Sequence, residues 1–313
     1  MSSIISAPGK RVLPTWRSLF YVPVTNEKFV DKAHTRGADA LVLDLEDSVA
    51  IARKEEARGL VAAAAEKVAR GGADVLVRIN RPWRLAIRDV EAAVAPRIHS
   101  LVLPKVENAQ HIRMLSEVVG ELEQERGMLP GTTRFVVLVE TAAAFPRMEE
   151  IAQCDPRVVA MSLGSEDFAA SCGMVPGEDG LYVPKMHMLV LARAAGIIPL
   201  GFIGTVVDYQ DLDGLRSAAE RARSLGFMAA TCIHPAQIPI VNAAYGPTVE
   251  EVAYARRVVD AASQAERDGA GAYVVDGKMI DFPVVNRARG ILERHAALEA
   301  RELAASPPSR ARP

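Results

Sequence analysis

Arg134-Phe-Val-Val-Leu-Val-Glu140 is the stretch of sequence on which the predicted fold rests. A short, unbroken apolar run that ends in a carboxylate is typical of a strand buried on both faces. The pattern returns further along the chain, where Val158-Val-Ala-Met-Ser-Leu163 runs into Gly164-Ser-Glu-Asp167. Two neighbouring parallel strands would bring Glu140 and Asp167 to one rim, where nearby carboxylates repel unless a proton or cation lies between them. We therefore predict a divalent metal ion held by Glu140 and Asp167; the alternative is that both merely favour helix starts.

Strand-like runs alternate with helix-like segments along most of the chain. Eight runs are predicted as strands: 18–22, 40–43, 75–79, 100–103, 134–139, 158–163, 198–203 and 228–233. This alternation is typical of βα repeats and predicts a TIM (β/α)8 barrel. A doubly wound open sheet is the structural alternative, because barrel closure cannot be read from a sequence.

Polar residues follow the predicted strands at the same end, as they do in TIM-barrel active sites. They are Asp44, Glu46, Asp47, Arg78, Lys105, Glu140, Asp167, Asp208 and His234. Arg78 could grip a substrate carboxylate bidentately or form a salt bridge with Asp44 or Asp47. We expect Asp44, Glu46, Asp47 and Lys105 to orient the residues that touch the ligand, and His234 to be a hydrogen-bonded rim residue.

The chain has 313 residues and a formal net charge of −2. This near balance gives no reason to expect nucleic acid or an anionic membrane as partner. The three cysteines form no CxxC pair, and residues 1–10 lack an apolar signal-peptide core, so we expect a cytoplasmic protein. The predicted organisation is a lead-in at 1–16, the barrel at 17–246, a C-terminal helix–hairpin–helix extension at 247–302 and a disordered tail at 303–313.

Several short motifs occur in a specific order. They are Arg17-Ser-Leu-Phe-Tyr-Val-Pro23, Leu43-Asp-Leu-Glu-Asp-Ser-Val49, Val77-Arg-Ile-Asn80, Leu103-Pro-Lys-Val-Glu107, Val139-Glu-Thr141, Leu163-Gly-Ser-Glu-Asp167, Ile233-His-Pro-Ala-Gln237 and Asp276-Gly-Lys-Met-Ile-Asp281. As an ordered set they resemble the citrate lyase β-subunit-like family of the HpcH/HpaI aldolase/citrate lyase superfamily. That family includes malyl-CoA and citramalyl-CoA lyases, and the resemblance covers about residues 17–290.

The resemblance implies roles for particular residues. Glu140 and Asp167 match the family's Mg²⁺ ligands, with Mn²⁺ as an alternative ion, and Arg78 together with Glu140 would bind the substrate. Asp281 matches an aspartate that serves acid–base chemistry and that reaches the site from a neighbouring subunit in a homotrimer or hexamer. Arg17 and Lys28 match weak contacts with CoA. Relatives usually have glycine where this chain has Val24, which restricts how closely the backbone can approach CoA.

The implied function is a Mg²⁺-dependent carbon–carbon lyase. It would cleave or form a β-hydroxyacyl-CoA such as malyl-, citramalyl- or citryl-CoA, with acetyl-CoA and a 2-oxo acid as the other products. Three alternatives remain open at this point. They are a malyl-CoA-type thioesterase on the same site, a citrate lyase β subunit acting on an acyl-carrier-bound thioester in a complex, and a CoA-independent 2-oxo acid aldolase.

Overall fold

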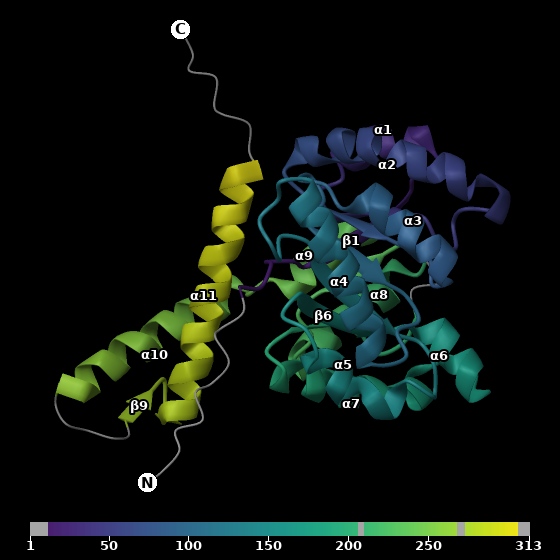
Figure 1. Ribbon diagram of the computed structural model, residues 1–313. Coiled ribbons are helices and arrows are strands. Elements are labelled where there is room, and N and C mark those ends of the chain that lie inside the picture. Colours follow the sequence, from purple (N-terminus) through teal and green to yellow (C-terminus); the bar gives the residue numbers. More distant parts are fainter. Residues whose placement is uncertain (1–11, 206–209, 268–272, 306–313) are drawn as a thin grey trace, which may run out of the picture. The chain divides into compact units, whose positions relative to one another are not determined.

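The computed structural model describes residues 12–205, 210–267 and 273–305. The chain forms two compact units, residues 1–245 and residues 246–313 (Figure 1). Asp208, the polar residue after the predicted seventh strand, lies outside the described residues, as does most of the predicted tail, 306–313. None of the described helices is long and apolar enough to cross a bilayer.

The first unit is built on eight parallel strands. In chain order they are β1 (Ser18–Pro23), β2 (Ala40–Asp44), β3 (Asp74–Arg78), β4 (Ser100–Leu103), β5 (Arg134–Val139), β6 (Val158–Leu163), β7 (Ile198–Leu200) and β8 (Ala230–Cys232). Each strand pairs with its neighbour in sequence from β1 to β7, and β8 pairs with β1. A parallel bridge between Leu200 and Ala229 joins the two ends of the sheet. The predicted TIM barrel is confirmed, and an open doubly wound sheet is excluded.

Helices follow the strands around the outside of the barrel (Figure 1). They are α1 (Glu27–Ala33), α2 (Lys54–Val68), α3 (Trp83–Ala93), α4 (Ala109–Glu125), α5 (Met148–Gln153), α6 (Ser165–Cys172), α7 (Glu178–Ala194), α8 (Leu212–Leu225) and α9 (Gln237–Tyr245). Short 3₁₀ turns precede or follow some of them: η1 (Ile51–Arg53), η2 (Ala69–Gly71) and η3 (Phe145–Arg147). The side chains of Asn26 and Asn108 cap α1 and α4, the role that asparagine commonly has before a helix.

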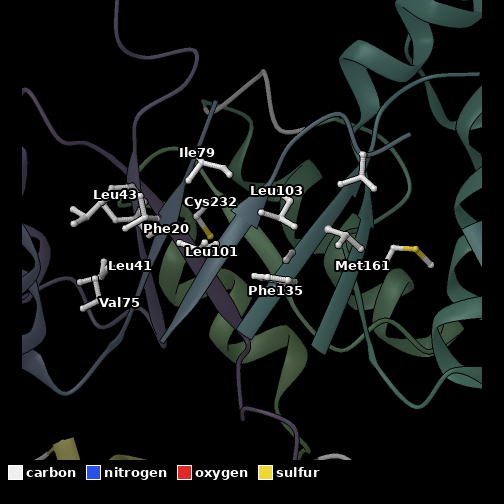
Figure 2. Packing of buried hydrophobic residues seen from close by; sticks show 14 of the residues in the cluster. Phe20, Leu41, Leu43, Val75, Ile79, Leu101, Leu103, Phe135, Met161 and Cys232 are labelled. Carbon is white, nitrogen blue, oxygen red and sulfur yellow. The ribbon is translucent and has the colours of Figure 1, made fainter. Parts of the chain in front are cut away.

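Alternate residues of each strand belong to two separate hydrophobic cores. Leu41, Leu43, Leu101, Leu103 and Phe135 point outward and pack with the surrounding helices (Figure 2). The intervening residues fill the barrel interior; they include Ala40, Val42, Leu76, Val102, Val136 and Leu138. Because side chains alternate along a strand, the next residues with inward parity are Asp44, Arg78 and Glu140. The strand period therefore aims these three polar side chains into the barrel mouth.

The N-terminal end of the barrel is filled by a residue of the predicted lead-in. Trp16 is only 1% exposed, belongs to the interior core and donates from Nε1 to Asp74 Oδ2 at 2.6 Å. A large apolar ring with a satisfied N–H is suited to such a place. The lead-in thus has a packing role that its Pro and Gly content did not suggest.

The second unit contains α10 (Val249–Arg267), a hairpin of β9 (Tyr273–Val275) and β10 (Lys278–Ile280), and α11 (Phe282–Ala305). Its small core includes Ala255, Val258, Val275 and Ile280. The hairpin turns at Asp276 (φ 51°) and Gly277 (φ 74°), as an Asp-Gly pair predicts. Helix α11 extends to Ala305, so residues 303–305 are helical.

Candidate active site

A cavity of about 790 Å³ opens at the C-terminal ends of the barrel strands. Its lining includes five of the predicted site residues: Asp44, Asp47, Arg78, Glu140 and Asp167. His234, at the end of β8, also lines it. This is the end of a TIM barrel where active sites are found.

Arg78, the last residue of β3, is surrounded by carboxylates. Its Nε and Nη2 form a bidentate pair with Asp44 at 2.7 and 2.8 Å. Its Nη1 lies 2.9 Å from Glu46 Oε2 and 3.2 Å from Asp47 Oδ2. Burial raises the pKa of Asp44, but the hydrogen bonds and charge of Arg78, with hydrogen bonds from Ser48 and Glu46, outweigh it and lower the pKa. The salt bridge considered for Arg78 thus exists, and it occupies the face of the guanidinium best suited to a bidentate ligand.

Tyr21 of β1 lies under the same guanidinium. The Arg78 carbon Cζ is 4.8 Å from the centre of the Tyr21 ring, in cation–π contact. Burial strongly raises the pKa of the Tyr21 hydroxyl, so that it keeps its proton. Tyr21 lines the cavity and was not predicted as a site residue, although its inward position in β1 was a signal for it.

Glu140 follows β5 and is almost fully buried. Its Oε2 accepts a 2.7 Å hydrogen bond from the backbone amide of Lys105. Burial, with the nearby charges of Glu46 and Asp167, raises the pKa of Glu140 to about 7. Nearby cations therefore do not fully compensate the negative charge of the ionised Glu140 side chain.

Asp167 lies in the first turn of α6, beside the end of β6. Its side chain is 48% exposed, and its Oδ2 is 3.8 Å from Lys105 Nζ. The position also suits an acidic residue near a helix start, and this placement is compatible with the predicted metal-ligand role, which stays a prediction. Helix α6 itself was not predicted from the sequence.

Lys105 connects the carboxylates of the rim. Besides its contacts with Glu140 and Asp167, its Nζ lies 3.0 Å from Glu46 Oε1. The residue adopts a left-handed backbone conformation, with φ 49°, which is uncommon for a residue with a side chain. Through Glu46, Lys105 continues the ionic network of Arg78 to the other side of the cavity.

The donor set of this rim fits a small divalent cation. Among the described residues, no three His, Cys, Asp or Glu side chains converge on one metal position. The protein's share would therefore be the two carboxylates Glu140 and Asp167, which suits Mg²⁺ because this ion keeps several waters and prefers oxygen ligands. Glu140 is buried, and the nearby charges of Glu46 and Asp167 disfavour its charged form, so a cation bound beside it would stabilise that form.

The residues predicted for CoA do not line the cavity. Arg17 precedes β1, at the N-terminal end of the strands, and its Nε pairs with Asp39 at 2.9 Å. Its position is thus at the other end of the barrel from the cavity. Lys28 is exposed on α1 and is not part of the lining either. Phe29 and Lys32 of α1, with Arg36 just beyond its end, line this side of the cavity instead, and the i,i+3 spacing of Phe29 and Lys32 could have shown that these two share a face.

Asp281 belongs to the second unit. It precedes α11, and its Oδ1 accepts a hydrogen bond from the amide of Val284 at 3.3 Å. This is the contact of a helix N-cap. A capping role does not exclude a chemical role for the same carboxylate.

Lys185 of α7 is a cavity residue for which the sequence offered no signal. Its side chain is buried, and its Nζ donates to Phe202 O at 2.6 Å and to Gly204 O at 3.1 Å. Burial lowers the pKa of this ammonium to about 7, in spite of the charge of Glu166. Helix α7 contains Pro184, and a proline inside a helix obscures the helical pattern of the sequence.

The comparisons with known proteins agree with this geometry. The family model of HpcH/HpaI aldolase/citrate lyase matches residues 17–235. The chain is 34% identical to the citrate lyase subunit beta of Escherichia coli K12 over 91% of this chain and 95% of that protein. It is 33% identical to a (3S)-malyl-CoA thioesterase of Cereibacter sphaeroides over 91% of this chain and 96% of the other.

A solved structure gives the same result. Protein CitE from Mycobacterium tuberculosis, in complex with magnesium, acetoacetate and coenzyme A, is 32% identical to this chain. The match has a TM-score of 0.67 and covers 89% of this chain and 97% of that one. The fold, the position of the cavity and the extent of these matches lead to one conclusion: the chain is a member of the HpcH/HpaI aldolase/citrate lyase family.

Proposed function

We propose that this protein is a Mg²⁺-dependent carbon–carbon lyase. Its substrate would be a β-hydroxyacyl-CoA such as malyl-, citramalyl- or citryl-CoA, and its products acetyl-CoA and a 2-oxo acid. The observation that carries the proposal is the presence of Glu140, Asp167 and Arg78 around a single cavity at the catalytic end of the barrel. Magnesium and coenzyme A in the related CitE structure support it.

Glu140 and Asp167 would hold the metal ion. When bound, Mg²⁺ would supply Lewis-acid stabilisation of the negative charge that develops on a substrate oxygen as the carbon–carbon bond breaks. The backbone amide of Lys105 fixes the orientation of Glu140 by its hydrogen bond to Oε2. Lys105 Nζ, between Glu46 and Asp167, limits the repulsion among the three carboxylates.

Arg78 would bind the carboxylate of the acid fragment. The edge formed by Nε and Nη2 is already occupied by the buried Asp44. At the other end of the guanidinium, Nη1 pairs with the buried Glu46 at 2.9 Å and with Asp47 at 3.2 Å, and the Asp47 side chain is 63% exposed. We propose that a substrate carboxylate takes the place of Asp47 there, because an exposed partner is the cheaper one to displace.

Asp281 is our candidate for the acid or base of the reaction. A base must accept the proton of the β-hydroxyl group, and an acid must return a proton to the departing enolate. This role rests on the Met279-Ile-Asp281 motif. We further propose that the protein is a homotrimer or hexamer in which one subunit supplies Asp281 to the site of another. An Asp281→Asn enzyme that keeps its affinity for the 2-oxo acid but loses kcat would support the chemical role.

The wall formed by Phe29, Lys32 and Arg36 is our candidate contact with the CoA carrier. It combines an aromatic surface with two cations, which suits the base and phosphates of a nucleotide. Replacement of Lys32 and Arg36 by glutamine should raise KM for the thioester and leave kcat close to that of the wild type. An unchanged KM would remove these residues from the carrier site.

Hydrolysis of the thioester is the second candidate function. The chain resembles a malyl-CoA thioesterase almost as closely as a citrate lyase subunit, so the relatives do not separate the two reactions. A third candidate is action on a thioester carried by an acyl carrier protein, as in a citrate lyase complex.

Product analysis separates these candidates. The purified protein would be incubated with malyl-, citramalyl- and citryl-CoA, each with Mg²⁺ and with EDTA. Acetyl-CoA plus a 2-oxo acid identifies the lyase, whereas free CoA plus a hydroxy acid identifies the thioesterase. Activity only on carrier-bound thioesters identifies the complex subunit. No reaction with any of the three CoA thioesters in the presence of metal would contradict the proposed function.

A further inference from the structure

Lys185 is a buried lysine that the proposed chemistry does not use. Its side chain is 4% exposed. Among the described residues, its Nζ donates to backbone carbonyls and forms no ion pair. Burial of an ammonium without a counter-ion is costly unless other groups accept its hydrogen bonds. Two backbone carbonyls serve here, those of Phe202 and Gly204.

Both carbonyls belong to the segment 201–205 that leaves β7. Gly201 and Gly204 have φ of 130° and 117°, conformations that L residues rarely adopt. A segment with two such glycines has little stiffness of its own. Its residues Gly201, Phe202, Gly204 and Thr205 line the cavity, so its position sets part of the cavity's shape.

The same segment is also fastened to the turn that carries Asp167. Ser165 Oγ, at the start of α6, donates to Gly204 O at 2.8 Å. Lys185 of α7 and Ser165 of α6 therefore meet on one carbonyl oxygen. The shared Gly204 carbonyl thus joins the segment after β7 to the Gly164-Ser-Glu-Asp167 turn.

The end of β2 shows the same arrangement. Lys54, the first residue of α2, is 7% exposed and donates to Leu45 O and to Glu46 O, both at 2.6 Å. These carbonyls also lie directly after the end of a strand, here β2, and Glu46 is part of the ionic network of the site. A buried lysine that holds two carbonyls beyond a strand end thus occurs twice around this barrel mouth.

We propose that Lys185 is a positioning residue, which holds segment 201–205 against the Asp167 turn and so shapes the wall that the 2-oxo acid touches. Among the described residues, Lys185 forms no hydrogen bond or ion pair with Glu140 or Asp167, so we expect it to act on the organic ligand and not on the metal ion. The part concerning the acid rests on the proposed function; the part concerning the segment does not.

The experiment compares Lys185→Met, Lys185→Arg and, as a surface control, Lys67→Met with the wild type. Hydrogen exchange of peptides covering 201–205 and 134–139, thermal unfolding, Mg²⁺ affinity and Mg²⁺-dependent pyruvate affinity would be measured. In Lys185→Met we expect exchange at 201–205 to rise and pyruvate affinity to fall, each by about tenfold. Exchange at 134–139 and Mg²⁺ affinity should stay within about twofold. A merely structural role would lower both affinities together.

Lys185→Arg keeps a long cationic donor and should restore most of the pyruvate affinity, and Lys67→Met should match the wild type. If neither Lys185 variant folds, Ser165→Ala provides the same test, because it removes the other donor to Gly204 O. Exchange at 201–205 within about twofold of the wild type in the folded variants would overturn the proposal. A wild type that binds no pyruvate would count against citramalyl-CoA as the substrate of the proposed lyase, and the exchange result would still decide the role of Lys185.

Discussion

The backbone amide of Lys105 donates a 2.7 Å hydrogen bond to Glu140 Oε2 while Lys105 itself holds φ at 49°. Residues with side chains are strained in this region, and such strain is kept where the surroundings require it. Here the unusual turn after β4 aims an N–H at the buried carboxylate. The same turn sends the ammonium to Glu46 and Asp167. One residue thereby orients a metal-ligand candidate and balances its neighbours' charge.

The two contributions of Lys105 can be separated by substitution. Lys105→Gly relieves the backbone strain, whereas Lys105→Ala keeps it, and both remove the ammonium. We expect the glycine variant to be more stable than the alanine variant by about 1 kcal/mol. Both should lose about tenfold or more in kcat/KM, because Glu46 and Asp167 lose their shared cation. Thermal unfolding and steady-state kinetics measure this, and equal stability of the two variants would show that φ carries no strain.

Gly164 leaves room for Glu140. A Cβ at position 164 would lie 2.6 Å from Glu140 Oε1 and 2.7 Å from its Cγ. The backbone of Gly164 has φ −70°, which any residue can adopt, so the obstacle is space alone. Gly164→Ala should therefore displace the carboxylate and weaken Mg²⁺ binding by about tenfold or more with the fold retained.

Gly59 in α2 is the matched control for Gly164. A Cβ at this position would meet nothing within 4 Å. Gly59→Ala should leave Mg²⁺ affinity unchanged and raise stability by up to about 1 kcal/mol, since alanine is the better helix former. Titration calorimetry on both variants checks the pair. Wild-type Mg²⁺ affinity in Gly164→Ala would show that Glu140 is not a ligand.

The two competing roles of Arg78 predict different results. If Arg78 only pairs with Asp44, then Arg78→Lys and Asp44→Asn should lower activity equally. If Arg78 also binds the substrate carboxylate, Arg78→Lys should raise KM further, because a single lysine ammonium cannot pair with Asp44 and reach the substrate carboxylate as the two sides of the guanidinium do. We expect kcat/KM of Arg78→Lys to be lower than that of Asp44→Asn by about tenfold. Equal values would reduce Arg78 to a structural ion pair.

His111 makes stability depend on pH. It is buried in α4 against the edge of Trp83, and burial, with the charge of Arg81, lowers its pKa to about 4. The unfolded chain takes up this proton near the ordinary pKa of about 6.5, whereas the folded chain does not. Stability is therefore lost as pH falls from about 6.5 towards 4, by at most about 1.4 kcal/mol for each pH unit.

His111→Leu should remove this part of the pH dependence. Denaturant unfolding of both proteins at several pH values between 4 and 7 measures it. The free energies of unfolding of the two proteins should converge, or cross in favour of the variant, as the pH falls. Parallel curves over the whole range would show that His111 titrates alike in the folded and unfolded chains.

Barrel strands 1–6 could be predicted from the sequence because continuous apolar runs such as Phe135–Val139 reflect burial on both faces. The last two strands are shorter than their apolar runs. Gly201, with φ 130°, turns the chain out of the sheet after Leu200. An apolar run shows that residues are buried, but it does not show where hydrogen-bonded pairing ends.

Site residues could be predicted from the sequence where a polar side chain occupies an inward-facing position of a strand. Asp44, Arg78 and Glu140 are polar residues in inward-facing positions, and the structure places all three around the cavity. Lys185 and Lys54 could not be found in this way. Their roles depend on backbone carbonyls of distant segments, and such partners leave no mark in the sequence.

The most direct test of the central claim is the binding of Mn²⁺, as a spectroscopic substitute for Mg²⁺, followed by electron paramagnetic resonance. The wild type, Glu140→Gln and Asp167→Asn would be titrated in parallel. We predict one bound ion per wild-type chain and an affinity lower by about tenfold or more in each variant, because each removes one of two protein oxygen ligands. Wild-type affinity in both variants, or no specific binding to the wild type, would contradict a metal site formed by Glu140 and Asp167.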